Sequence, residues 1–130
     1  MTWPLAGGRP LGQRGEALAR RFLRKAGLKI LGQDYRCPGG EIDLIALDRS
    51  TRKTLGAETI VFVEVKTRSS PDGTRPEAAV DTDKEARIQS AAAYYLAHYP
   101  TEGYRTRYDI VAVILPEGEK PRITHTPNAF

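Results

Sequence analysis

Two stretches of the sequence decide the fold: "GGEIDLIALD", which runs from Gly39 to Asp48, and "IVFVEVKTRS", which runs from Ile60 to Ser69. Both are rich in the aliphatic and β-branched residues that are typical of buried strands. Charged residues nevertheless stand inside them: Asp43 in the first, Glu64 and Lys66 in the second. Because isolated charges are costly to bury, these three side chains require a physical explanation.

The two stretches are expected to pair as an antiparallel hairpin, with strands at residues 41–47 and 60–67 and a polar connection between them. The register that aligns the apolar runs predicts these pairs: Leu47–Ile60, Leu44–Val63 and Ile42–Val65. The same register sets Asp43 opposite Glu64, with Cβ atoms about 5 Å apart. Strand alternation turns Phe62, Glu64 and Lys66 to one face. The sequence therefore predicts that Asp43, Glu64 and Lys66 converge near one end of a sheet.

The rest of the chain predicts helices at residues 11–26 and 83–99 and further strands at residues 28–35, 107–115 and 122–125. Glu16 lies at the edge of the apolar stripe of the first helix and could lean over the sheet; the alternative is an exposed first-turn acid. Lys84 stands one turn before Ile88, so its ammonium could reach the sheet. We predict an α/β fold with a mixed, mostly antiparallel sheet of four or five strands flanked by helices.

Length and composition narrow the classes of protein. The 130 residues suit a single domain at residues 11–130, with the Gly- and Pro-punctuated residues 1–10 as a flexible arm. A lone cysteine, Cys37, excludes an internal disulfide framework. No apolar run approaches the roughly 20 residues of a membrane span, and we expect a cytoplasmic protein. The net charge of +4 suits a polyanionic partner.

The charged strand residues indicate a chemistry. Two carboxylates, a backbone carbonyl and water form a hard oxygen site that suits Mg²⁺ or Mn²⁺. A lysine beside such a site can position or deprotonate a water molecule, and it can stabilise charge on a phosphorane-like transition state. Hydrolysis of a phosphodiester needs this combination. The alternative is a structural ion-pair cluster at the rim of the sheet.

The order of these motifs resembles a known superfamily. Asp43 followed by Glu64-x-Lys66 resembles the PD-(D/E)XK signature of restriction-endonuclease-like nucleases, although Ile42 stands where that name has a proline. More narrowly, the chain is similar to the YraN-like uncharacterised protein family of that superfamily. The stretches that carry this resemblance are "GQRGEALARRFL", "GGEIDLIALD", "VFVEVKTRS", "DKEARIQSAAAYYL", "RYDIVAVI" and "THTPNAF".

The resemblance implies roles for several residues. Asp43, Glu64 and the Val65 carbonyl would hold a divalent metal, and Lys66 would be the catalytic lysine. Glu16 would match the helix acid of Holliday-junction-resolvase-like relatives. Lys84 and Gln89 would match polar helix positions that approach the site. Resolvase-like relatives act as dimers, so a homodimer is an open alternative.

Other polar residues divide into phosphate contacts and structural groups. Arg68, Arg75 and Lys53 are expected in loops that flank the predicted site and are our candidates for contacts to DNA phosphates. Arg107 and Asp109 are expected to form a structural ion pair, and His125 to be an ordinary edge histidine. The function that we favour is a metal-dependent nuclease acting on DNA. The alternatives are a nucleic-acid-binding module with little or no cleavage, and an accessory protein of a DNA-processing complex.

Overall fold

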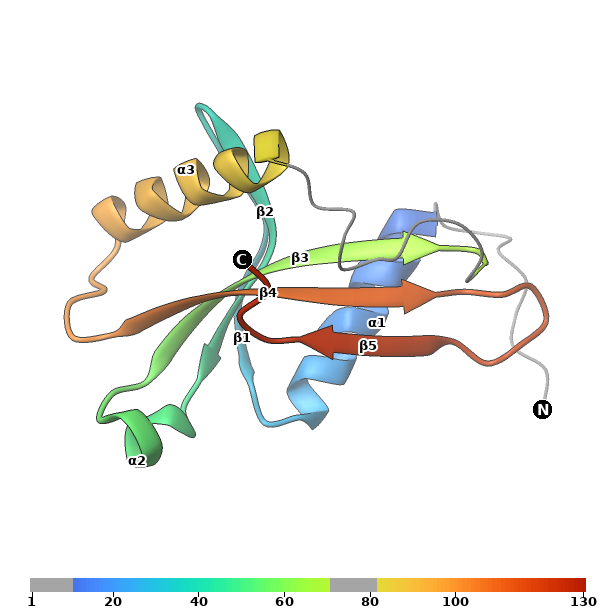
Figure 1. The fold of residues 1–130 in the computed structure, drawn as a ribbon, viewed down its shortest axis with the longest axis horizontal. Coiled ribbons are helices and arrows are strands. Elements are labelled where there is room, and N and C mark those ends of the chain that lie inside the picture. Colours follow the sequence, from blue (N-terminus) through green and yellow to red (C-terminus); the bar gives the residue numbers. More distant parts are fainter. Residues whose placement is uncertain (1–10, 71–81) are drawn as a thin grey trace.

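In the computed structural model, which describes residues 11–70 and 82–130, a five-stranded sheet carries helices on both faces (Figure 1). The elements are α1 (Leu11–Lys25), β1 (Lys29–Cys37), β2 (Gly40–Asp48), α2 (Thr51–Leu55), β3 (Thr59–Arg68), α3 (Thr82–His98), β4 (Arg105–Ile114) and β5 (Arg122–Thr126). The strand order is β1-β2-β3-β4-β5, and every neighbouring pair is antiparallel except β3–β4, which is parallel. This confirms the predicted mixed α/β fold.

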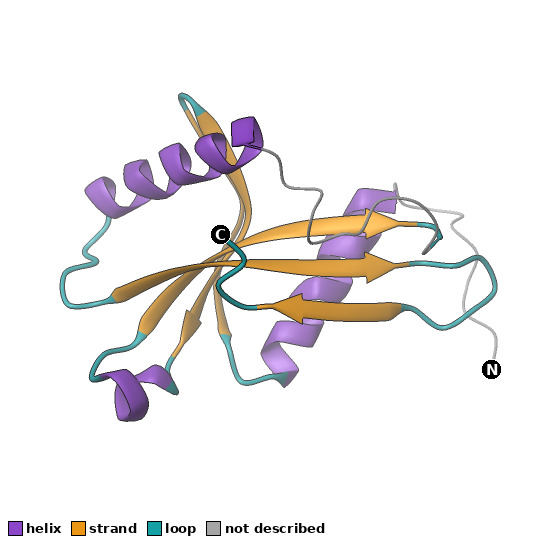
Figure 2. Cartoon of the chain, viewed as in Figure 1, coloured by secondary structure: helices purple, strands orange, loops and turns teal. Residues whose placement is uncertain are grey.

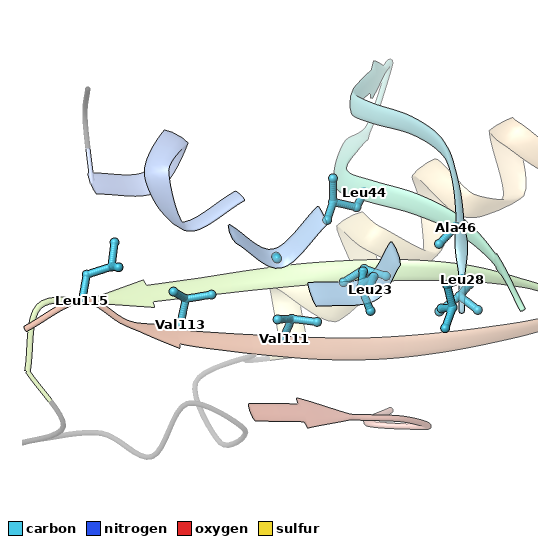
Figure 3. Packing of buried hydrophobic residues seen from close by; sticks show 10 residues of the cluster. Leu23, Leu28, Leu44, Ala46, Val111, Val113 and Leu115 are labelled. Carbon is cyan, nitrogen blue, oxygen red and sulfur yellow. The ribbon is translucent and has the colours of Figure 1, made fainter. Parts of the chain in front are cut away.

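Two hydrophobic clusters, one on each face of the sheet, hold the helices in place. In the first, Leu23 of α1 lies over Val111 and Val113 of β4 (Figure 3), and Val61 and Val63 of β3 belong to the same cluster. The second gathers Ile88 and Ala91 of α3 with Ile42, Ile60 and Phe62, among others. The alternation predicted for β3 is confirmed, because its odd-numbered valines face α1 while Phe62 faces α3. Glu64 and Lys66 therefore follow Phe62 on the even-numbered side of β3.

The predicted hairpin register is correct for most of its length and wrong at one end. Leu47 pairs with Ile60 and Leu44 with Val63, as expected, but the β2–β3 ladder stops at that second pair. The predicted pairing of Ile42 with Val65, and of Asp43 with Glu64 across the ladder, is not formed. Instead the Val65 N–H donates to Asp43 Oδ2 at 2.8 Å. A side chain thus takes the donor that the next backbone pair would use, and the strands diverge there.

Glycines allow both helices to approach the sheet where the strands diverge. A Cβ atom at Gly15 of α1 would overlap the side chain of Thr67 on β3. A Cβ atom at Gly40, at the start of β2, would overlap the backbone carbonyl of Arg87 on α3. These close approaches bring Glu16, next to Gly15, and Lys84, one turn before Arg87, toward the same end of β3.

The structure adds one helix and leaves some predictions outside its reach. The polar connection between β2 and β3, for which the sequence predicts no helix, contains the short helix α2, visible as the isolated turn of helix in Figure 2. The predicted arm at residues 1–10 lies outside the described residues, as do residues 71–81. Among the described helices, none is long and apolar enough to span a membrane.

Candidate active site

The charges predicted to converge do lie together, at the end of the sheet where β2 and β3 separate. Glu64 is almost fully buried, at 4% exposure. Its Oε1 atom lies 2.5 Å from Lys84 Nζ of α3 and 3.7 Å from Lys66 Nζ of its own strand. The predicted reach of Lys84 from α3 to the sheet is confirmed. Asp43 is held beside this group by its hydrogen bond from the Val65 N–H.

Burial and mutual repulsion give two acids of this cluster an unusual affinity for protons. Burial is the largest cause that raises the pKa of Asp43, from 3.8 to about 7, followed by the charge of Glu64; the Val65 N–H opposes the rise. Burial also raises the pKa of Glu16, from 4.5 to about 7, together with a hydrogen bond to Asp34 and the charges of Asp34 and Glu64. Glu16 therefore belongs to the cluster, as one reading of its helix position predicted.

Asp34 is a member of the cluster that the sequence did not reveal. It lies in β1 between Gln33 and Tyr35, which pair with Leu44 and Ile42, so it lies across from Asp43. Its backbone has φ +49°, an uncommon value that aspartate tolerates better than most residues. A hydrogen bond joins its side chain to the carboxyl group of Glu16. Hydrophobic periodicity does not predict a local irregularity of this kind. The only feature of the sequence that pointed to Asp34 was an acidic residue inside a predicted strand.

The two lysines respond to the cluster in opposite ways. Burial lowers the pKa of Lys66, and the neighbouring Lys84 lowers it further. Burial also works against the charge of Lys84, but hydrogen bonds to Glu64 and Lys66 outweigh it and raise the Lys84 pKa. Lys84 is thus the stable counterion of Glu64, whereas Lys66 releases its proton more readily than an ordinary lysine. A lysine in that condition is suited to proton transfer.

The cluster opens to a small hollow of about 40 Å³, lined by Asp43, Glu64, Lys84, Ile88, Glu41 and Arg87. A volume of that size has room for a water molecule or a small ion. Glu41 and Arg87 form its rim and lie 3.7 Å apart. Both were missed at the sequence level, although Glu41 stands two residues before Asp43 and strand alternation could have indicated it.

The two carboxylates at the hollow, Asp43 and Glu64, are ligands of the type that divalent cations prefer. In residues 11–70 and 82–130, no three Asp, Glu, His or Cys side chains are grouped as metal ligands. Asp43 and Glu64, with the Val65 carbonyl, give the hard oxygen donors that Mg²⁺ and Mn²⁺ prefer. Burial and the charge of Glu64 raise the pKa of Asp43 although Lys66 and Lys84 lie nearby, so the carboxyl group of Asp43 is not fully compensated within the protein. The residues present therefore fit a cation bound next to Asp43 and Glu64.

The residues predicted to contact phosphates are scattered. Arg68 follows Glu64 and Lys66 on the even-numbered side of β3, and its buried Nε finds no hydrogen-bond partner within the described part of the chain. Lys53 lies in α2, beyond the far end of β2 from Asp43, so it is not brought to this site. Gln89 is exposed and does not line the hollow; one residue on from Ile88, it is turned by about 100°. Arg75 lies outside the described residues.

A second buried polar cluster surrounds Asp109 of β4. Asp109, fully buried, accepts hydrogen bonds from Arg107 at 2.9 and 3.0 Å and from the Asn128 N–H at 3.2 Å, and lies 2.7 Å from His125 Nε2. Arg107 also bonds Asp48 at 3.1 Å. The predicted structural pair of Arg107 and Asp109 is confirmed. The expectation for His125 was too simple, since this edge histidine contacts the buried acid.

Comparison with known proteins places the chain in a family. The family model described as "Uncharacterised protein family UPF0102" matches residues 15–113. A UPF0102 protein of Geobacter metallireducens is 41% identical over 92% of this chain and 91% of its own length. One of Syntrophus aciditrophicus is 45% identical over 82% and 79%, and one of Nocardia farcinica is 41% identical over 92% and 88%. The chain therefore belongs to the uncharacterised protein family UPF0102.

Proposed function

We propose that this protein is a metal-dependent nuclease that hydrolyses phosphodiester bonds in DNA. The observation that carries the proposal is the convergence of Asp43, Glu64 and Lys66 from two strands, with Glu16 from α1, around one end of the sheet. Acids and a lysine in that arrangement meet the needs of phosphodiester hydrolysis. The resemblance of the motif order to PD-(D/E)XK nucleases supports the same conclusion by analogy.

The proposed metal is Mg²⁺ or Mn²⁺, held by Asp43, Glu64 and the Val65 carbonyl. When bound, such an ion supplies charge neutralisation for the phosphate and makes a water molecule more acidic. The chain's own contribution is the preorganised acid pair. The Val65 N–H fixes Asp43 at the point where the strands diverge, so the carboxylate is oriented before any ligand arrives.

The lysines divide the remaining work. Lys66, whose pKa burial lowers, can move a proton to or from a water molecule beside the phosphate, and in its charged form it stabilises negative charge there. Lys84 balances Glu64 in the free protein. A cation at Glu64 would release Lys84 toward the DNA phosphates. Glu16 and Asp34 share a hydrogen bond behind Asp43 and supply negative potential that favours cation binding.

Arg68 supports the assignment of a polyanionic substrate. Its guanidinium has a buried Nε without an acceptor among residues 11–70 and 82–130. A buried donor left in this way costs free energy that an incoming acceptor recovers. Arg68 follows Lys66 on the even-numbered side of β3, so a phosphate oxygen bound there would lie beside the acid cluster.

A second candidate function is a nucleic-acid-binding module that does not cleave. The 2.5 Å ion pair between Lys84 and Glu64 favours it, because a stable internal counterion competes with a metal. The two candidates differ in what the acid cluster does for DNA. In a binding module its removal leaves DNA affinity intact, whereas in a nuclease it abolishes cleavage.

The test is cleavage of labelled DNA of several shapes in Mn²⁺ and in Mg²⁺, with wild type, Glu64→Gln and Lys66→Met. We expect cleavage by the wild type and a loss of at least about a hundredfold in each variant. Glu119→Gln, which changes an exposed acid in the turn before β5, is the matched control and should cleave normally. Mn²⁺ should also raise the melting temperature of the wild type and not that of Glu64→Gln. DNA binding without cleavage at any metal concentration would favour the binding module.

A further inference from the structure

A second concave surface lies at the opposite end of α3 from the candidate active site. It is a groove of about 440 Å³, within the size range of ligand pockets. The residues that line it come from the C-terminal end of α3, the start of β1, the β2–α2 junction, and the segments around β3 and β4; they include Lys29, Arg49, Tyr95, Tyr99 and Tyr104. None of them takes part in the acid cluster.

The groove concentrates exposed apolar surface. Of the six large hydrophobic side chains exposed in the described residues, three line it: Leu31 at 40% exposure, Tyr99 at 50% and Tyr104 at 42%. Scattered exposed hydrophobic residues need no explanation, but a group of them around one hollow is typical of a binding surface.

The tyrosines are arranged as a supported stacking platform. Tyr95 is wedged edge-on against Phe62 and Tyr35, with ring centroids 5.9 and 5.4 Å apart. Tyr99 stacks on Tyr95 at 4.5 Å with an angle of 24° between the rings. Because Tyr95 is fixed by the core, the ring of Tyr99 is held in a defined plane while half of its surface stays exposed. The protein would therefore lose little conformational entropy when a flat apolar ligand stacks on Tyr99.

The charges around the platform favour an anionic ligand. Lys29 and Arg49 are exposed and line the groove, against the single acid Glu58. Proteins that bind single-stranded nucleic acids combine two features: aromatic side chains on which the bases stack, and lysine and arginine side chains that contact the phosphates. This groove has both. A purely apolar peptide would leave both cations without a function.

The distance to the acid cluster matches a short stretch of one DNA strand. Lys84 and Tyr99 are 15 residues apart on and just after α3, which corresponds to about 22 Å along the helix axis. At about 3.4 Å per stacked nucleotide, that length equals roughly six nucleotides. The hollow with Ile88 and the groove with Tyr95 lie toward opposite ends of the same helix, so a strand of that length can reach from one to the other.

We propose that this groove binds an unpaired, single-stranded segment of DNA by stacking its bases on Tyr99 and Tyr104. The substrate of the site is then DNA that carries a single-stranded tail next to the position cleaved. The cleavage part of this inference rests on the proposed nuclease function, whereas the binding part does not.

The test separates binding from cleavage. Affinity is measured by fluorescence anisotropy for labelled oligothymidine and for duplexes with thymidine tails of about three, six and nine nucleotides, in EDTA so that no cleavage occurs. We expect affinity to rise steeply once the tail reaches about six nucleotides. Tyr99→Ala and Tyr104→Ala should each weaken tail binding by at least about fivefold, the lower end for loss of one stacked base. Lys29→Ala and Arg49→Ala should each reduce the salt dependence of the DNA affinity by an amount that corresponds to about one phosphate contact.

Two controls keep the result interpretable. Tyr94→Ala removes another exposed tyrosine of α3, which stacks on His98 and does not line the groove, and it should bind as the wild type does. Tyr99→Phe keeps the ring and should also keep the affinity. Equal affinity of wild type and Tyr99→Ala for every tail would overturn the proposal. So would a shift from dimer to monomer in Tyr99→Ala with unchanged DNA binding, because the groove would then be a contact between two copies. If tails bind as expected but nothing is ever cleaved, only the nuclease function fails.

Discussion

The sheet holds two groups of buried charges, and they are balanced in opposite ways. Asp109 is surrounded by donors from Arg107, His125 and the Asn128 backbone, and although burial works to raise its pKa, these partners hold it below its usual value. Asp43 has one backbone donor, other acids beside it, and a pKa raised to about 7. Both acids are costly to bury, but only the first is compensated within the protein.

The contrast gives a criterion for distinguishing structural from functional groups among buried charges. A compensated group such as Asp109 stabilises the fold and needs nothing further. An undercompensated group such as Asp43 lowers the stability of the free protein, and a bound cation or proton offsets that cost. The same sheet therefore supplies an internal standard: variants in the Asp109 cluster and in the Asp43 cluster should shift stability in opposite directions.

The largest expected effect is at the compensated cluster. Asp109→Ala leaves the Arg107 guanidinium buried without its main partner, and we expect the free energy of unfolding to fall by about 3–5 kcal/mol. Urea unfolding at pH 7 measures it. Thr106→Ala, an exposed position of the same strand, is the control and should stay within about 0.5 kcal/mol of the wild type. A loss below about 1 kcal/mol in Asp109→Ala would mean that the cluster is not structural.

The next effect has the opposite sign and depends on pH. The pKa of Asp43 is raised by burial and by Glu64 from 3.8 to about 7, so its folded form holds a proton that the unfolded chain releases. Stability from this group is present below about pH 4 and is lost as the pH rises through 7. We expect Asp43→Asn, measured in EDTA at pH 8.5 or so, to be more stable than the wild type by roughly 1–3 kcal/mol, and the gain to shrink toward pH 5.

Asp48→Asn is the matched comparison for that experiment. Ser50 and Arg107 overcome the effect of burial and lower the Asp48 pKa, so its stabilisation is present above about pH 4 and is lost as the pH falls below that value. Asp48→Asn should therefore be less stable than the wild type at pH 7, with the difference disappearing in acid. If Asp43→Asn and Asp48→Asn changed stability in the same direction at pH 8, the contrast between the two clusters would be wrong.

The sequence predicted the apolar framework and the meeting of Asp43, Glu64, Lys66 and Lys84, because each depends on periodicity and on hairpin pairing. It failed where a side chain replaced a backbone contact. Periodicity cannot indicate that Asp43 takes the Val65 N–H and ends the ladder. It also cannot indicate the φ of +49° that presents Asp34 to Glu16.

The contacts within the Asp109 cluster also differ in how well the sequence predicts them. Arg107 and Asp109 are two residues apart in one strand, so their pairing follows from alternation alone. The partners of Asp109 from β5 and the chain end, such as His125 and Asn128, depend on which strand closes the edge of the sheet. Long-range partners of that kind become visible only when the strand order is known.

The smallest expected effect marks the boundary of the undercompensated cluster. Glu41 lies on the rim of the hollow, exposed, with Arg36 at 3.8 Å and Arg87 at 3.7 Å. Exposed pairs of this kind contribute little, because water screens them. We expect Glu41→Gln to change the free energy of unfolding by less than about 0.5 kcal/mol and to leave the alkaline loss of stability as in the wild type. If instead Glu41→Gln removed that loss, or abolished the rise in melting temperature with Mn²⁺, then Glu41 would belong to the undercompensated cluster around Asp43. The proposed cation would then lie between Glu41 and Asp43, nearer to solvent and to Arg87 than to Lys66.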